Sequence, residues 1–294
     1  MSQLASRSSG RRRLRKATNF VALSLTGIGT LFAIGAFLLV IGYLVVGGIR
    51  ALHWGTLVEG ATPMGSGGGG LRNAIVGTLI LILVASCIGV PIGILGGVYQ
   101  VESKNRFAGT VRFLADVLNS IPSIVIGLFV YSVVVIPIAQ RHQGQGFSAL
   151  AGGIAMSIIM IPIVMSTTEE ILRMVPNSIR EASLALGASR CRTMWRVLLP
   201  AARGGLITGV MLAVARVAGE TAPLLFTAFG NVTFNIRLDK AIDALPLSIF
   251  YNATSPYDYL HQQAMAGSIL LIGLIFLLSL VTRFALRSPT LAES

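Results

Sequence analysis

Apolar residues along the chain form six long runs that are separated by shorter, more polar segments. The runs cover residues 20–46, 73–99, 113–138, 148–168, 204–229 and 263–282. Each run is long enough to cross a hydrocarbon core of about 30 Å, because a helix rises about 1.5 Å per residue. The pattern predicts an all-α protein, a polytopic bundle of six transmembrane helices.

The composition agrees with a membrane protein. Of the 294 residues, 54% are hydrophobic and 12% are charged, whereas soluble domains carry about 25% charged residues. Cys87 and Cys191 lie far apart and the histidines are isolated, so the sequence predicts neither a disulfide framework nor a metal site. It also offers no set of nucleophile, base and orienting residue, and we expect no enzymatic active site.

Lysine and arginine are distributed unevenly between the two sides that the six runs define. If the N-terminus is cytoplasmic, the inner segments hold seventeen of them and the outer segments five, and only Arg216 lies within a run. Because cytoplasmic loops of membrane proteins carry an excess of these residues, we expect both termini in the cytoplasm. The net charge of +12 then requires no nucleic-acid partner, and the basic N-terminal tail is expected to bind anionic membrane lipid.

The predicted organisation has four parts. Residues 1–19 form a basic cytoplasmic tail, 20–70 the first span and a glycine-rich outer loop, 71–285 a core, and 286–294 a cytoplasmic C-terminal tail. The first run is longer than the hydrophobic region of a cleavable signal peptide, so we expect it to remain as a span. The sequence contains no GK[ST] ending of a phosphate-binding loop,. No cofactor is therefore expected on this chain, and any ATP and magnesium would be bound by a partner.

The inner segment 169–203, EEILRMVPNSIREASLALGASRCRTMWRVLLPAAR, is amphipathic. Its apolar positions predict two short helices with a break at Gly187, and Pro200 is predicted to begin the entry into the fifth run. A basic, partly apolar helix pair could lie on the bilayer or dock into a groove of another protein. The residues themselves leave both alternatives open.

The fifth run contains two charged residues, in ARVAGETAPLLFTA at 215–228. An arginine at the centre of a membrane helix costs roughly 2.5 to 3.5 kcal/mol on insertion scales. Arg216 and Glu220 are four residues apart, so they share one face of a helix and can form an ion pair. Either the pair neutralises itself within the bundle, where apolar packing could replace it, or it lines a polar pathway.

Prolines near these charges predict breaks in the helices. Pro223 lacks the amide that would bond the carbonyl of Gly219, and its ring clashes with that carbonyl. Gly219, Glu220 and Pro223 therefore predict a kinked or opened turn at mid-membrane depth, with Thr221 among the candidate pathway residues. Irregular backbone at that depth is tolerated only where it is buried in protein or lines a water-filled cavity.

The third run repeats this pattern in ADVLNSIPSIVIGLF. Pro122 predicts a half-helix with Ser120 as its N-cap and the proline in its first turn. The free amides at such a helix start can attract an anion. Asn119, Ser120 and Ser123 either line a pathway or form hydrogen bonds between helices.

Two sets of residues resemble a known family. EAS at 181–183 is followed after three residues by Gly187 and after nine more by VLLP at 197–200. This spacing resembles the EAA signature of bacterial ATP-binding-cassette importer permeases, with conservative departures at Ser183 and Val197. SIPSIVIGLF and ARVAGETAPLLFTA further resemble the PstA-type permease family of bacterial phosphate importers, over about residues 71–285.

The resemblance implies a type I, MetI-like importer permease fold and a subunit that forms half of a phosphate pathway in the bacterial plasma membrane. In that family the 169–203 loop is a coupling element that inserts into a cleft of the ATPase. This implies coupling roles for Glu181, Ala182, Gly187, Leu199 and Pro200. It also implies that Arg216 and Glu220 match intramembrane charges implicated in transport.

The resemblance implies several partners. They are a PstC-type permease paralogue, two copies of a PstB-type ATPase that binds ATP and magnesium, and a PstS-type phosphate-binding protein. Three alternatives remain at this point. They are a permease subunit for another anion or small polar solute, an ion-coupled carrier or channel that works alone, and a structural membrane anchor.

Overall fold

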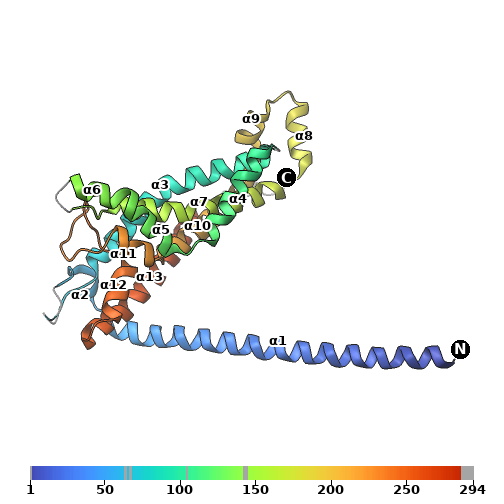
Figure 1. Ribbon diagram of the computed structural model, residues 1–294, viewed down its shortest axis with the longest axis horizontal. Coiled ribbons are helices and arrows are strands. Elements are labelled where there is room, and N and C mark those ends of the chain that lie inside the picture. The colour runs from blue at the N-terminus through green and yellow to red at the C-terminus, as the bar shows by residue number, and fades with distance from the viewer. Residues whose placement is uncertain (1, 63–64, 66–67, 104, 142–144, 286–294) are drawn as a thin grey trace.

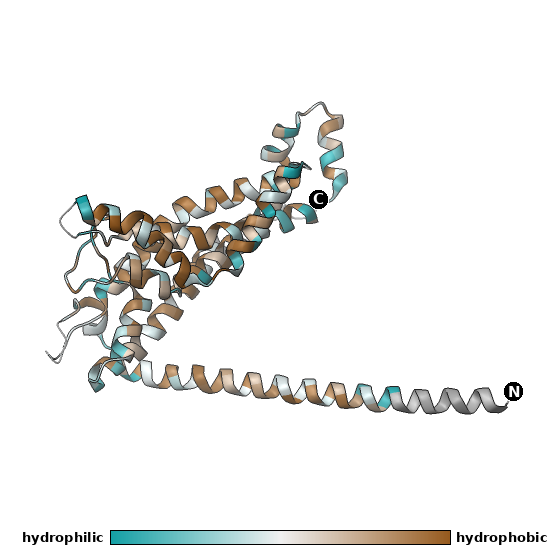
Figure 2. Ribbon diagram, viewed as in Figure 1, coloured by the Kyte–Doolittle hydropathy of each residue, from teal (hydrophilic) through white to brown (hydrophobic). Residues whose placement is uncertain are grey.

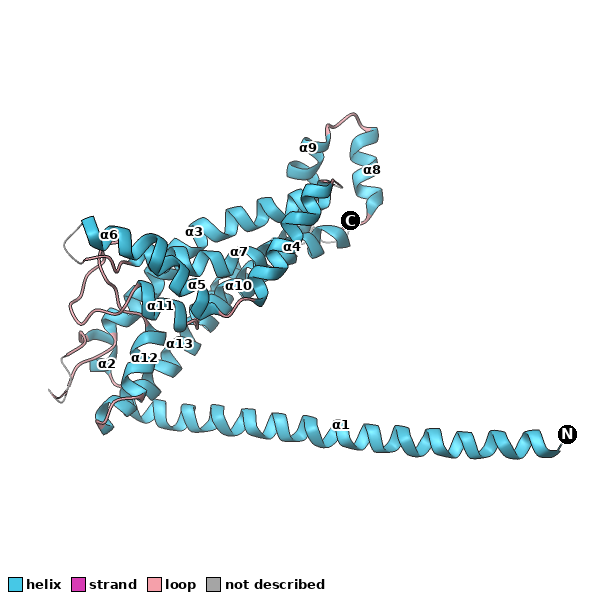
Figure 3. Cartoon of the chain, in the orientation of Figure 1, coloured by secondary structure: helices cyan, strands magenta, loops and turns pink. Residues whose placement is uncertain are grey.

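The computed structural model describes residues 2–62, 65, 68–103, 105–141 and 145–285. The described residues form helices joined by loops, without a β-strand (Figure 3). Six helical stretches are long and apolar enough to cross a membrane: Arg15–Ala51, Arg72–Glu102, Ser123–Arg141, Ala149–Met174, Arg190–Ala218 and Asp258–Thr282. The prediction of an all-α bundle with six spans is confirmed.

The centre of the bundle is the contact between α3 (Arg72–Glu102) and α7 (Ala149–Met174). Glycines of α3 bring the two helices together. A Cβ added at Gly93 would lie 2.6 Å from the Cβ of Val164, and one at Gly97 would lie 2.5 Å from the Cβ of Thr168. Small residues of this kind let transmembrane helices pack by close van der Waals contact, where lipid removes the hydrophobic driving force.

Two further helices complete the core on α7. They are α10 (Leu199–Ala218) and the short α11 (Ala222–Thr227). The largest core side chains are fully buried between these elements and include Leu81, Met156, Met160, Val217 and Leu224. The core thus packs against one face of the end of α10, where the sequence also places its charged residues.

The first helix, α1 (Ser2–Ala51), is continuous and leaves the bundle at an angle (Figure 1). Only 6% of its most apolar 18-residue stretch is buried, and the part of the helix that Figure 2 colours ranges mainly from white to brown, which marks hydrophobic residues. Its C-terminal end packs on α13 (Asp258–Ala285), where a Cβ at Gly48 would lie 2.4 Å from the Cδ1 of Ile269. The predicted first span is confirmed as a helix, and this helix extends beyond both ends of 20–46.

The third apolar run is not one helix, so its predicted extent of 113–138 is wrong. The chain forms α4 (Arg106–Ser120), α5 (Ser123–Val130), the π-helical turn η1 (Tyr131–Val135) and α6 (Ile136–Arg141). Pro122 disfavours helical backbone at the residue before it, and Ile121 is accordingly extended, with φ −71° and ψ 131°. The membrane-crossing part therefore begins only at Ser123.

The fifth predicted span, 204–229, is also displaced. Its helix starts in the inner segment with α9 (Arg190–Thr193), continues through the π-helical turn η2 (Met194–Leu198) and ends with α10. Pro200 lies in the first turn of α10, as predicted for the entry into the fifth run, but the helix already begins at Arg190. Both π-helical turns end two residues before a proline, Pro137 or Pro200, and the altered hydrogen-bond pattern accommodates the amide that proline lacks.

The helices α2 (Trp54–Val58), α8 (Asn177–Ala185) and α12 (Leu245–Ala253) also lie outside the spans, as α4 and α11 do. The helix α12 docks against the start of α3, where the Leu245 amide donates to Thr78 Oγ1 at 2.8 Å. Beside it, Asp243 accepts from the Ser248 hydroxyl at 2.6 Å and from the Ala244 amide at 2.8 Å. Burial raises the pKa of the Asp243 carboxyl to about 6.

Candidate functional site

The charged residues of the fifth run lie where α10 ends. Arg216 is in the last turn, Gly219 follows the helix as its C-cap, and Glu220 comes directly after. The Nη2 atom of Arg216 lies 3.9 Å from Oε1 of Glu220. The predicted ion pair is present, but its separation is too long for a hydrogen bond.

The two partners differ in exposure. The side chain of Arg216 is 59% exposed on this chain and that of Glu220 is 17% exposed. The guanidinium therefore keeps donors that the carboxylate does not occupy, while the carboxylate lies close enough to balance its charge. A planar, permanently charged guanidinium with free donors is suited to bidentate contact with an oxyanion.

The backbone after Arg216 is broken, as the sequence predicts. α10 stops at Ala218, Glu220 is not helical, and α11 begins at Ala222 with Pro223 in its first turn. A proline in the first turn loses nothing, because the first amides of a helix have no partner within it. The half-buried Thr221 connects the two helices, and its carbonyl accepts from the Leu224 amide at 3.1 Å.

The second break, between α4 and α5, differs from the prediction in one respect. Ser120 is the last residue of α4, and its hydroxyl donates to the Asp116 carbonyl at 2.8 Å. It is therefore not the N-cap of the next helix. Pro122 occupies that position, with φ −55° and ψ 133°, because the extended Ile121 moves the start of α5 beyond the reach of Ser120.

The two breaks are brought together by contact between α5 and α11. A Cβ added at Gly127 would lie 2.6 Å from the Cα of Pro223, so the two proline-initiated helices meet backbone to backbone. Asn119 and Ser120 are exposed at the end of α4, and Ser123 is half-buried. Among the described residues, no hydrogen bond or ion pair joins any of these three to Arg216.

The predicted coupling segment folds into a helical hairpin, α8 and α9, which projects from one end of the bundle (Figure 1). We call this the hairpin end of the bundle. The turn requires glycine, because Gly187 has φ +82°, in the left-handed region that other residues avoid. The Gly187 amide donates to the Leu184 carbonyl at 2.9 Å and the Ala188 amide to the Ser183 carbonyl at 3.2 Å. The predicted break at Gly187 is confirmed.

The residues of the coupling motif lie in two places. Glu181 and Ala182 are exposed on α8, beside the tip at Leu186, which is 89% exposed. Leu199 and Pro200 instead belong to the long helix, where Leu199 packs on a small core cluster. The motif therefore has one part on an exposed surface of the hairpin and one part in the first turn of α10, the helix that carries Arg216.

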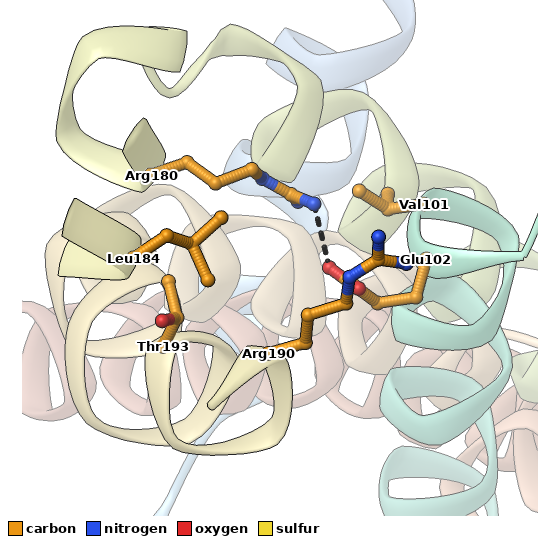
Figure 4. Close-up of a pocket in the computed structure, with 6 residues that line it drawn as sticks. All are labelled: Val101, Glu102, Arg180, Leu184, Arg190 and Thr193. Atoms are coloured by element: carbon orange, nitrogen blue, oxygen red, sulfur yellow. Dashed lines mark ion pairs between the residues drawn. The ribbon is translucent and has the colours of Figure 1, made fainter. Parts of the chain in front are cut away.

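Two ionic groups at the hairpin end were not predicted. Glu169, whose side chain is 9% exposed, pairs with Arg112 of α4 and, at 2.9 Å, with Arg173. Glu102, at the end of α3, pairs with Arg180 at 2.8 Å beside a cavity of about 460 Å³ (Figure 4). The spacing of Glu169 and Arg173 could have indicated the first pair, but no sequence signal connects Glu102 with a residue in the hairpin.

Comparison with known proteins identifies the family. The family described as "Binding-protein-dependent transport system inner membrane component" matches residues 89–288. "Phosphate transport system permease protein PstA" of Yersinia pestis is 40% identical over 271 residues, which cover 92% of this chain and 90% of that protein. The protein of the same name from Haemophilus influenzae is also 40% identical, over 92% of this chain and 94% of its own length. These alignments are longer than the predicted region of resemblance, 71–285, and therefore extend into the first 70 residues.

A solved structure supports the same assignment at the level of fold. The MetNI methionine ABC transporter in an inward-facing conformation is 20% identical, covers 75% of this chain and 94% of the matched chain, and has a TM-score of 0.56. The predicted MetI-like fold is thus confirmed. This chain belongs to the family of inner membrane components of binding-protein-dependent transport systems, among its PstA-type permeases.

Proposed function

We propose that this chain is the transmembrane subunit of an ATP-driven phosphate importer and forms half of the pathway. The observation that carries the proposal is Arg216, whose guanidinium is 59% exposed beside a loose carboxylate partner at the break between two helices. The relatives named PstA are phosphate transport permeases, and this supports phosphate over another anion.

In this proposal the pathway runs past the two helix breaks. Phosphate contacts the Arg216 guanidinium as it passes, and Glu220 balances that charge when the site is empty. Thr221, Asn119, Ser120 and Ser123 supply polar groups along the route. Binding stays weak, because the site offers one arginine next to a carboxylate, and a pathway must release its anion.

The energy comes from a partner chain that binds ATP and magnesium. The family description names a binding-protein-dependent system, which supports an extracytoplasmic binding protein as a second partner. We assign the α8–α9 hairpin, with Glu181, Ala182 and Gly187, to the ATPase surface. We assign the other half of the pathway to a PstC-type paralogue, and the ATPase and binding protein to the PstB and PstS types.

The orientation follows from the distribution of basic residues. Both termini are assigned to the cytoplasm of a bacterial cell, which places the hairpin on the cytoplasmic side, with residues 1–19 and 286–294 as tails. The region 71–285 is assigned as the permease core. Residues 1 and 286–294 lie outside the described residues.

Reconstitution tests the proposal. The complete complex with its binding protein should take up radiolabelled phosphate into proteoliposomes that contain ATP, and sulfate in tenfold excess should compete poorly. Equal competition by sulfate would indicate a permease for anions in general. Uptake by this chain without any ATPase would contradict the importer-subunit assignment and favour an ion-coupled carrier.

A further inference from the structure

The α8–α9 hairpin meets the end of α3 at Val101 and the acidic Glu102. Arg180 of α8 pairs with Glu102 through Nη1 and Oε1 at 2.8 Å. Arg190, at the start of α9, lines the same cavity as this pair (Figure 4) and forms no ion pair with Glu102 within 4.0 Å. The cavity of about 460 Å³ between them is lined by Val101, Glu102, Arg180, Leu184, Arg190 and Thr193. Among these lining residues one carboxylate therefore balances two guanidinium groups.

The hairpin is also fastened internally. The hydroxyls of Ser183 and Thr193 are 3.0 Å apart and buried, which ties α8 to α9 across the turn at Gly187. This contact joins the two helices of the hairpin to each other. Because Thr193 also lines the cavity, this internal contact lies next to the contact with α3.

We propose that Glu102 is a positioning residue that fastens the hairpin to α3, so that movement of the hairpin is passed directly to the α3–α7 core. The hairpin is joined to α7 and α10 by the continuous backbone. Its link to α3 depends on side-chain contacts alone. With the Glu102–Arg180 ion pair intact, displacement of the hairpin also displaces α3. The glycines of α3 allow this helix to pack closely against α7, so α7 receives the same displacement. This inference rests on the proposed function, which assigns the hairpin to the ATPase.

The charge balance predicts an order of effects. Loss of the Glu102 carboxylate leaves Arg180 and Arg190 facing each other across the cavity without a counter-charge. Loss of Arg180 leaves Glu102 with Arg190, which lines the same cavity, as the nearby cation that can still balance its charge. Glu102→Gln should therefore be more harmful than Arg180→Gln, and neutralising Arg190 in the Glu102→Gln background should repair part of the defect.

The experiment measures coupling in the full complex. Phosphate uptake and ATP hydrolysis are measured in the same proteoliposomes, and their ratio is compared between variants. We expect the ratio to fall about 5-fold in Glu102→Gln, as for loss of a partly buried ion pair, less in Arg180→Gln, and to recover partly in Glu102→Gln/Arg190→Gln. Arg106→Gln is the matched control, because this exposed arginine lies outside the cavity, and it should keep the wild-type ratio.

A normal ratio in an assembled Glu102→Gln complex would overturn the proposal. If that variant does not assemble, the exchanged pair Glu102→Arg/Arg180→Glu decides, because it retains one acid and two arginines. Recovery of assembly and ratio supports the proposal, and continued failure overturns it. A wild-type chain that does not bind an ATPase would instead contradict the proposed function itself, so the two failures are distinguishable.

Discussion

The Arg216–Glu220 pair at the end of α10 and the Glu169 cluster at the hairpin end of α7 use the same charged groups in different ways. Glu169 is nearly buried and holds two guanidinium groups, one of them from another helix, α4. Arg216 and Glu220 are 3.9 Å apart, and it is the arginine that is exposed. The buried carboxylate joins two helices, whereas the loose pair leaves an exposed guanidinium.

The first prediction concerns Arg216. Arg216→Ala should reduce phosphate uptake by about 10- to 150-fold, which corresponds to about 1.5 to 3 kcal/mol for one lost hydrogen bond to a charged group. Glu220→Gln should reduce uptake less, because the guanidinium remains. Both variants should still copurify with the ATPase. Loss of assembly in both would show that the pair is structural and would remove the contrast with Glu169.

The second prediction concerns Gly187. Gly187→Pro should abolish coupling or ATPase docking, because proline fixes φ near −65° and the turn requires +82°. Gly187→Asn is the matched control, since asparagine tolerates left-handed backbone. Copurification of the ATPase and the transport ratio measure the two effects. Equal behaviour of the two variants would contradict a role for the turn geometry.

The third prediction concerns Glu169. Glu169→Gln should lower the melting temperature of the purified chain by several degrees, because it removes the shared counter-charge of two arginines, Arg112 and Arg173. Removing one partner of a buried pair is costly, although the half-exposed arginines reduce that cost. Glu220→Gln should leave the melting temperature nearly unchanged. A larger fall in melting temperature for Glu220→Gln than for Glu169→Gln would show that Glu220, and not Glu169, has the structural role.

The sequence predicts helix breaks better than helix ends. Pro223 and Gly187 act locally, through a missing amide and a left-handed turn, so their effects could be predicted from a few residues. The start of α5 depends on the extended Ile121, and the course of the fifth helix depends on a π-helical turn that accommodates Pro200. Neither has a clear signal in hydropathy, and both shifted the predicted spans.

The ionic contacts show the same limit in the candidate site. Arg216 and Glu220 are four residues apart, so helix geometry alone predicts their proximity. Glu102 and Arg180 are 78 positions apart in the chain, and only the packing of the hairpin on α3 brings them together. The sequence likewise could not predict the 3.9 Å separation of Arg216 and Glu220 or the exposure of the guanidinium, because both depend on how α10 ends.

The fourth prediction concerns Asp243 and has the smallest expected effect on transport. Replacing Asp243 by asparagine should instead change how the melting temperature depends on pH. Burial raises the pKa of this carboxyl from 3.8 to about 6, and the Tyr251 beside it also has a raised pKa. The folded chain then binds a proton more tightly than the unfolded chain, so stability is greatest below about pH 4 and falls as pH rises to about 6. Asp243→Asn carries no such charge, and its melting temperature should fall less over that interval.

Asp239→Asn is the control. In the wild type the hydrogen bond from Arg237 lowers the pKa of the Asp239 carboxyl to about 2, so the stabilisation from that carboxyl is lost only as pH falls below about 4. Asp239→Asn should therefore keep the wild-type slope between pH 4 and 6. Equal pH slopes for wild type and Asp243→Asn would show that this carboxyl is solvated rather than buried against α3.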